Sequence, residues 1–506
     1  FADRYPGIAV VGGFLRDLDN GGEKLELAQT DRQLYQVLSM GAGSFGLGAI
    51  EFSSLPPGAS VGNRVRITGC EQVTNNGSYI IRAVEGNTVL VNRTFVDAPG
   101  GALAQVFEVL AGVEYNDKNG WPLAADGIGY SLVYADGTWR ASAEPGGSPG
   151  AADPSPQVYP ALLVNEALTH TDLPQVDAVE IYNPTGSPVS LAGWWLTDDL
   201  DEPDKFQIGA VGLPAGGYVV LDETAFGGAF RLASGGEEVF LFSPDLRYNH
   251  GFEFGSAENA VSFGRHLDSR GNEHFVRQAT VTLGAANSGP RIGPVVISEI
   301  FYHPPGAGFE FLEVTNISTS PVDLTDWGIG GIGFEFPPGT ILEPGEVALI
   351  VEDPAAAPGA PGGTQTFLTE GKLSNGGERL RVRRRDGTGG WITLDEVDYD
   401  DKSPWPETPD GDGPSLERIA NEAFGDDHAN WRASAVNGGT PGASEPPTGP
   451  LIAFEPAAIA VSTLEVTDAD PADFEVWNVG IDTLGYIILD DSSWLAVSPG
   501  GGSSQN

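Results

Sequence analysis

Cysteine is almost absent from this chain of 506 residues, which contains only Cys70. A single cysteine cannot form an intramolecular disulfide, and no CxxC or Cys/His cluster has the spacing of a zinc site. Lysine is also scarce, with five lysines among 26 basic residues, against 70 acidic residues. The cysteine count therefore excludes a disulfide framework and a zinc module, but it does not indicate the redox compartment.

Long apolar runs are missing as well. No stretch of about 18 apolar residues occurs, and no basic segment followed by an apolar one opens the chain. The sequence therefore predicts no transmembrane segment. Because the chain starts at Phe1 in the middle of a pattern and ends in GGGSSQN, we expect both ends of the protein, including any signal peptide, to lie outside this sequence.

Positive charge is in short supply, since the formal net charge is -44. Such a surface repels phosphate backbones and anionic membranes, so nucleic acid is not an expected partner. The chain also lacks a G-x-S-x-G elbow, a Walker loop and an HExxH motif. The sequence therefore contains no recognisable catalytic motif, and we expect a protein that is not an enzyme.

What the chain has in abundance is glycine and proline, 70 and 38 residues respectively. This content disfavours helices and is typical of many short strands joined by tight turns. Residues 162–194 and 295–327 moreover repeat one pattern at a constant offset, in which Glu166 matches Glu299 and Trp194 matches Trp327. The sequence predicts an all-β protein built from tandem modules.

Each copy of the repeat predicts a strand, a loop, a strand, a turn and a strand. In the second strand Val179 and Ile181 alternate with polar or small residues, which is typical of a half-buried strand. These motifs, with the later GPSLERI, NWRAS and GGTPGA segments (413–443), resemble the lamin tail domain, an immunoglobulin-like β-sandwich. The resemblance implies tandem sandwiches at residues 158–290 and 294–445, and it implies little about activity, because one fold hosts many functions.

The N-terminal region matches only the back part of a third copy. Gly21-Gly22-Glu23 corresponds to Gly376-Gly377-Glu378, and the match resumes at residues 113–122 and continues to GGSPGA. We therefore expect residues 1–150 to be a truncated lamin-tail-like domain with a small inserted β-domain at about 31–111, whose NNG and EGN turns predict hairpins. Because its strands lack neighbours, we expect residues 1–30 and 112–150 to be the least stable part.

Three short segments rich in Pro, Gly and Ala, residues 143–160, 284–294 and 435–450, are predicted to be stiff linkers. Beyond them, residues 450–506 resemble part of a bacterial immunoglobulin-like module of the BACON kind, through the segments FEVWNVG and SSWLAVSP. Such modules often accompany carbohydrate-directed proteins, so the resemblance raises a glycan as a partner.

Acidic side chains offer two candidate sites. Glu166 with Glu180, and Glu299 with Glu313, fit paired carboxylates for acid/base chemistry or a metal, but we favour solvent-facing positions on adjacent strands with backbone or Arg partners, because catalytic pairs need not recur in tandem. The acidic loops suit calcium, although none has the EF-hand pattern. A solvated turn is the favoured alternative to calcium. The candidate calcium ligands are Asp398, Asp400, Asp401, Asp410 and Asp412.

The basic run at Arg381, Arg383, Arg384 and Arg385 fits either an anion site or, as we favour, a strand that offsets nearby carboxylates. His303 is expected to be structural. The excursion at residues 352–371 has no counterpart in the second copy, so it is either a binding loop or a disordered bulge.

Together these features favour a non-catalytic segment of a large exported bacterial protein, in which the sandwiches act as surface spacer or adhesion modules. We expect it at the cell surface or outside the cell, with an extracellular protein or a glycan as partner. The alternative is an accessory arm of a secreted or surface enzyme, a hydrolase or a spore-coat-type kinase, whose catalytic domain lies elsewhere.

Overall fold

The computed structural model describes residues 18–30, 32–117, 120–306, 308–353, 361–443, 452–455, 474–478, 483–488 and 497–505. In these residues strands predominate, and the sheets are antiparallel apart from one parallel pairing, so the all-β prediction is confirmed. None of the described helices is long and apolar enough to cross a membrane. The chain separates into two compact units, Phe1–Pro156 and Gln157–Asn506.

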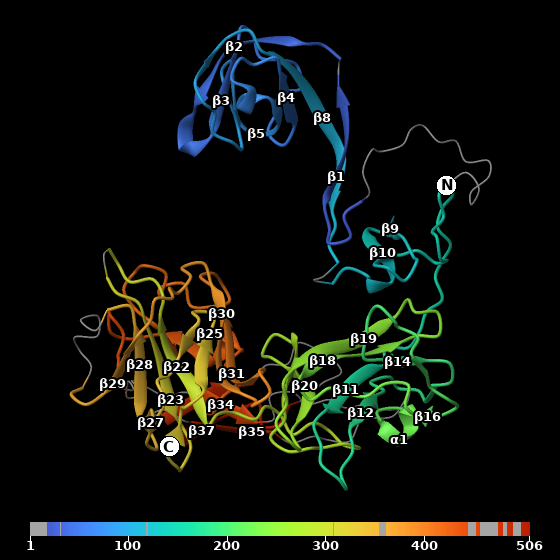
Figure 1. Ribbon diagram of the computed structural model, residues 1–506, viewed down its shortest axis with the longest axis vertical. Coiled ribbons are helices and arrows are strands. Elements are labelled where there is room, and N and C mark those ends of the chain that lie inside the picture. Colours follow the sequence, from blue (N-terminus) through green and yellow to red (C-terminus); the bar gives the residue numbers. More distant parts are fainter. Residues whose placement is uncertain are drawn as a thin grey trace. The chain divides into compact units, whose positions relative to one another are not determined.

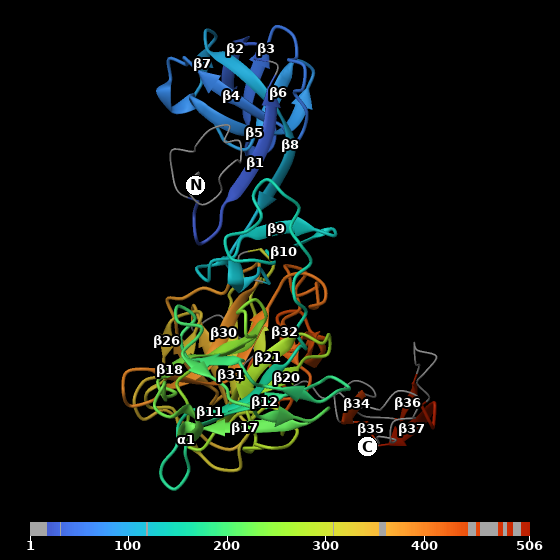
Figure 2. The ribbon, with the colours of Figure 1, turned by 90° about the vertical axis from the view of Figure 1, so that its right-hand side faces the viewer.

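In the first unit eight strands form one sheet, in the order β1-β8-β4-β5-β6-β3-β2-β7, and a further pairing of β2 with β8 closes its central part into a small barrel (Figures 1 and 2). An apolar core fills the barrel. A separate two-stranded sheet follows. The strands are β1 (Lys24–Thr30), β2 (Tyr35–Ala42), β3 (Gly48–Phe52), β4 (Arg64–Thr68), β5 (Gly77–Glu85), β6 (Thr88–Val91), β7 (Ala98–Pro99), β8 (Leu103–Glu114), β9 (Leu132–Ala135) and β10 (Thr138–Ala141).

The hairpins predicted for the insert are present, since β4 pairs with β5 and β5 with β6. The predicted end of the insert at residue 111, however, falls inside β8. This strand pairs with β4 over its first residues and with β1 over the rest. The predicted insert is therefore joined to β1 through one long shared strand.

The turn that precedes β1, beside the end of β8, has the same geometry as the turn in the second unit that precedes β30 (Glu378–Arg385), beside the end of β31 (Trp391–Tyr399). Gly22 and Gly377 have φ values of +104° and +94°, and at both positions a Cβ would collide with the carbonyl oxygen of a tyrosine, Tyr115 or Tyr399. Each tyrosine hydroxyl donates a 2.8 Å hydrogen bond to a backbone carbonyl just before the glycines. The match between the two Gly-Gly-Glu segments is thus a match of structure, and it explains why glycine is needed there.

The second unit contains a first sandwich, strands β11 to β21, and a second sandwich, strands β22 to β33. In the first sandwich a sheet of order β17-β12-β11-β20-β21 packs on a sheet of order β15-β14-β18-β19, and β13 pairs with β16. The elements are β11 (Leu163–Leu168), β12 (Ala178–Tyr182), β13 (Val189–Ser190), β14 (Trp195–Thr197), β15 (Phe206–Gln207), β16 (Gly212–Leu213), β17 (Tyr218–Asp222), α1 (Glu223–Phe226), β18 (Gly236–Phe242), β19 (Asn249–Gly255), β20 (Ser262–Leu267) and β21 (Glu273–Arg277).

The second sandwich has the same strand order, β28-β23-β22-β32-β33 against β26-β25-β30-β31, with β24 paired to β27 and one added edge strand, β29 (Figure 1). Trp194 and Trp327 are buried in the two cores, as predicted. The strands are β22 (Val295–Phe301), β23 (Phe311–Asn316), β24 (Val322–Asp323), β25 (Trp327–Gly330), β26 (Phe334–Glu335), β27 (Ile341–Leu342), β28 (Val347–Val351), β29 (Gln365–Leu368), β30 (Glu378–Arg385), β31 (Trp391–Tyr399), β32 (Leu416–Arg418) and β33 (Trp431–Ala433).

Beyond the second sandwich, β34 (Ile452–Glu455) pairs with β35 (Glu475–Asn478), and β36 (Thr483–Ile487) pairs with β37 (Gly501–Gln505). Much of the predicted 450–506 module lies outside the described residues. The division of the chain into four modules with the boundaries given above stays a prediction.

Candidate functional site

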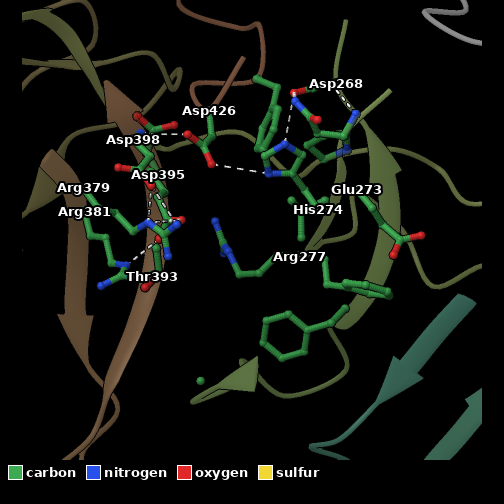
Figure 3. Close-up of a pocket in the computed structure, with 18 of the residues that line it drawn as sticks. Asp268, Glu273, His274, Arg277, Arg379, Arg381, Thr393, Asp395, Asp398 and Asp426 are labelled. Carbon is green, nitrogen blue, oxygen red and sulfur yellow. Dashed lines mark hydrogen bonds and ion pairs between the residues drawn. The ribbon is translucent and has the colours of Figure 1, made fainter. Parts of the chain in front are cut away.

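The two sandwiches of the second unit contact one another directly, through side chains near β19 to β21 on one side and around β30 and β31 on the other. A cleft of about 930 Å³ lies between them. Its walls carry arginines, carboxylates and aromatic rings, and the close-up shows Arg277 extending from the first sandwich toward β31 (Figure 3). The hydrogen bonds across this interface are Ser269 to Asp427, Arg277 to the carbonyl of Leu394, Arg384 to Glu258 and Ser256 to Asp386.

Arg277 and Glu258 form the buried centre of this interface. The Arg277 guanidinium lies 2.5 Å from Glu258 and donates a 2.9 Å hydrogen bond to the Leu394 carbonyl. Burial alone would raise the pKa of Glu258, but Arg277, with help from Arg384 and Arg291, holds it below its ordinary value. Arg277 and Glu258 both belong to the first sandwich. Arg277 reaches the Leu394 carbonyl of the second sandwich, and Glu258 accepts a hydrogen bond from Arg384 of the second sandwich, so these two contacts join the modules.

A histidine also spans the interface. His274 on β21 lies 3.4 Å from Asp426 of the second sandwich and 3.5 Å from Asp268 of the first. Burial alone would lower the pKa of His274, but the two carboxylates outweigh it and the pKa is raised. Its ring also packs edge-on against Phe424. The contact therefore strengthens when His274 is protonated.

Strand β30 carries the basic run seen in the sequence, and Arg381 and Arg383 of that run line the cleft. Arg379 donates to Asp398, and Arg381 lies 2.5 Å from Glu396 on the neighbouring strand β31. Farther along, Arg384 pairs with Glu258 and Arg385 with Glu335. The interpretation that these arginines offset carboxylates thus holds for most of them, and Arg383 is the exception.

A second candidate site consists of glutamates on adjacent strands. Glu166 on β11 faces Glu180 on β12, and Glu299 on β22 faces Glu313 on β23. All four are at most 4% exposed. The expectation that they face solvent is wrong, and so is the half-buried character predicted for β12, because a closing segment covers this face of each sheet.

In the second sandwich the closing segment is bonded directly to the glutamate pair. Thr440 donates its N–H (2.8 Å) and its hydroxyl (3.2 Å) to Glu299, and Gly442 donates its N–H (2.8 Å) to Glu313. The hydroxyl of Ser415 donates to Glu299 as well. The first sandwich has the same arrangement, formed by Glu166, Glu180, Thr282, Gly284 and Ser262.

Burial raises the pKa of Glu299 and of Glu313 to about 7, because the donated hydrogen bonds offset only part of the desolvation of the charge. The pKa of Glu180 is raised for the same reason. Of the backbone or Arg partners that we expected, the described residues supply backbone N–H groups. The pairs act as acceptors that hold the closing segments. The predicted linker at 284–294 is bonded to the first sandwich through Asn287, which donates to the carbonyls of Asn165 and Arg265, and to the second through Pro294, whose carbonyl accepts from the N–H of Ile317.

The structure does not gather the candidate calcium ligands around one point. Asp398 pairs with Arg379, Asp401 with Lys402, and Asp410 lies 2.5 Å from His303, while Asp400 accepts from the backbone N–H of Lys402 and Asp412 is exposed. Within the described ranges, no group of three or more Asp, Glu, His or Cys could hold a metal ion. Three of the five candidate calcium ligands are thus paired with a basic side chain.

His303 has the structural role that we expected, since it joins the loop after β22 to the acidic loop. Residues 354–360 of the 352–371 excursion lie outside the described residues, and the remainder returns as strand β29, parallel to β28. No sequence pattern indicated the cleft, because its walls come from two modules whose docking depends on contacts between residues far apart in the chain.

Comparison with known proteins gives limited matches. No curated protein matches the chain. A crystal structure of a DUF4876 family protein from Bacteroides thetaiotaomicron VPI-5482 aligns with 12% identity and a TM-score of 0.20, over 55% of this chain and 93% of that one. Residues 289–401 match the model of the Lamin Tail Domain family, so one lamin tail domain, an immunoglobulin-like β-sandwich, is identified in the region of strands β22 to β31.

Proposed function

We propose that the chain is a non-catalytic spacer and binding segment of a large exported bacterial protein, working at the cell surface or outside the cell. In this proposal the first sandwich is a second lamin-tail-like module, since it shares the strand order and the buried glutamate pair of the second. Residues 1–150 are a partial third copy, and residues 450–506 are part of a BACON-like module.

The observation that carries the proposal is the joint between the two sandwiches. Buried Arg277 bonds to the Leu394 carbonyl, and Arg384 pairs with Glu258, so these contacts hold the two modules side by side and leave a cleft between them. A fixed joint suits a segment that holds its neighbours at a set spacing, and a cleft between modules is a common place for a ligand. The partner would be an extracellular protein or a glycan, and the acidic surface disfavours nucleic acid.

Distances between spin labels test the joint. Labels would be placed on the exposed positions Ser190 and Thr366, one on each sandwich, in a Cys70→Ala background. We expect one narrow distance distribution, which Arg277→Gln broadens. A broad distribution in the otherwise unmodified chain would show that the sandwiches move freely and would contradict a spacer role. A hydrolase or kinase activity of the purified chain, lost on replacing one carboxylate, would contradict the non-catalytic part.

A further inference from the structure

Arg383 lies in the wall of the cleft. The other arginines of β30 each lie within 4 Å of a carboxylate. In the part of the chain that the structure describes, Arg383 has no ion pair, and its Nε is buried without a hydrogen-bond partner. An unpaired, partly buried guanidinium is costly to the fold, and an anionic ligand would offset that cost.

The guanidinium of Arg383 is held in place by packing. Its Cζ lies 4.3 Å from the ring centre of Trp391 on β31, and on β25 a Cβ at Gly330 would come within 3.3 Å of it. Burial lowers the pKa of Arg383, and the neighbouring charges of Arg385 and Arg381 lower it further. Stacking fixes the plane of the guanidinium but occupies no N–H group. Because Nε is buried, the two terminal NH2 groups are the donors that can form two hydrogen bonds to one ligand carboxylate.

The rest of the lining restricts the ligand. Asp398, Asp400 and Asp426 line the same cleft, and the whole chain has a formal net charge of -44. Both features disfavour a ligand with many negative charges. The same carboxylates are good acceptors for hydroxyl groups, and a volume of about 930 Å³ holds a ligand larger than a single small ion. A polyhydroxylated molecule with one acidic group satisfies both the donors and the acceptors.

From these observations we propose that the cleft binds a saccharide bearing a carboxylate, with Arg383 gripping the carboxylate and the aspartates accepting from the hydroxyls. The inference deepens the proposed function by naming a ligand class for its cleft. It can fail without that function, because the spin-label distances that test the joint do not depend on a ligand.

Calorimetric titration of the full chain with glucuronic acid, glucose and acetate tests the proposal. We expect glucuronic acid to bind more tightly than either of the others, and Arg383→Gln to weaken its affinity by about tenfold or more, the loss of a charge-assisted bidentate contact. Arg385→Gln is the matched control, since Arg385 also stacks on Trp391, at 3.8 Å, but pairs with Glu335 and is not part of the cleft lining. A cooperative thermal unfolding transition in each variant would show that both fold.

Three results would overturn the inference. One is an affinity for glucuronic acid that Arg383→Gln leaves unchanged, and another is acetate binding as tightly as glucuronic acid. The third is tighter binding of free glutamate, which would mean that the aspartates recognise an ammonium group in place of hydroxyls.

Discussion

Raising the pH from about 5 to about 8 should loosen the closing segment of the second sandwich. Glu299 and Glu313 have an ordinary carboxyl pKa of 4.5, and burial raises it to about 7 in the folded protein. The folded state therefore binds these protons more tightly than the unfolded state. Their contribution to stability is complete below about pH 4.5 and is lost as the pH rises through 7.

The size of the effect follows from the shift in pKa. One pKa unit corresponds to about 1.4 kcal/mol of free energy, so the rise in pKa from 4.5 to about 7 is worth about 3 kcal/mol for one carboxyl. If the segment opens locally, amide protection there should fall by up to about two orders of magnitude across this pH range. Hydrogen exchange of the Thr440 and Gly442 amides, which donate to the two glutamates, measures this, with intrinsic rates corrected at each pH.

The double variant Glu299→Gln with Glu313→Gln should lose most of this pH dependence, because glutamine resembles the neutral acid. Glu343→Gln is the control, since Glu343 is exposed in the same sandwich. Corrected protection that stays flat or rises between about pH 5 and 8 in the unmodified chain would show that both glutamates are ionised in the folded state. The argument from desolvation would then be wrong.

Four further outcomes are expected. Arg277→Gln should destabilise the second unit by about 3 kcal/mol in urea unfolding, whereas Arg291→Gln, whose side chain is exposed, should cost under about 1 kcal/mol. Gly377→Ala should lower stability by at least about 1 kcal/mol, because φ is positive and its Cβ would collide with a carbonyl. Calcium should raise the thermal midpoint no more than magnesium does, and a calcium-specific rise would restore the acidic loop as an ion site. Hydrogen exchange should be slow in the barrel strands and fast in β9 and β10; equal protection would contradict the instability expected for residues 112–150.

Sequence reasoning reached the features that depend on local pattern. The period-2 alternation and the turn residues located the strands on either side of the turn NPTGSP, residues 183–188, and also the hairpins of the insert. Strands and turns of this kind follow from backbone geometry over a few residues. The constant spacing of the repeat also placed Trp194 and Trp327 in equivalent buried positions.

The same reasoning failed where a distant segment decides the environment. Glu180 and Glu313 occupy the polar face of an alternating strand, and alternation alone assigns that face to solvent. The segments that cover these glutamates lie near the C-terminal end of each sandwich. They contribute mainly backbone N–H groups, which have no sequence signature. The cleft was missed for a related reason, because Arg277 reaches across to a backbone carbonyl of the other sandwich.

The glutamate pair also connects two sequence motifs, because the GGTPGA segment contacts the glutamate of the opening strand. Gly439 has a φ of +71°, and a Cβ there would run into Glu299, so the glycines of GGTPGA let the segment approach the buried carboxylate. The first unit carries the similar segment GGSPGA, yet within its described residues no buried glutamate meets it, and Ser148 there donates to Asp153. Its two-stranded sheet leaves Tyr134 exposed. In each of the two sandwiches the closing segment therefore bonds to a glutamate pair, and this contact links the opening and closing motifs.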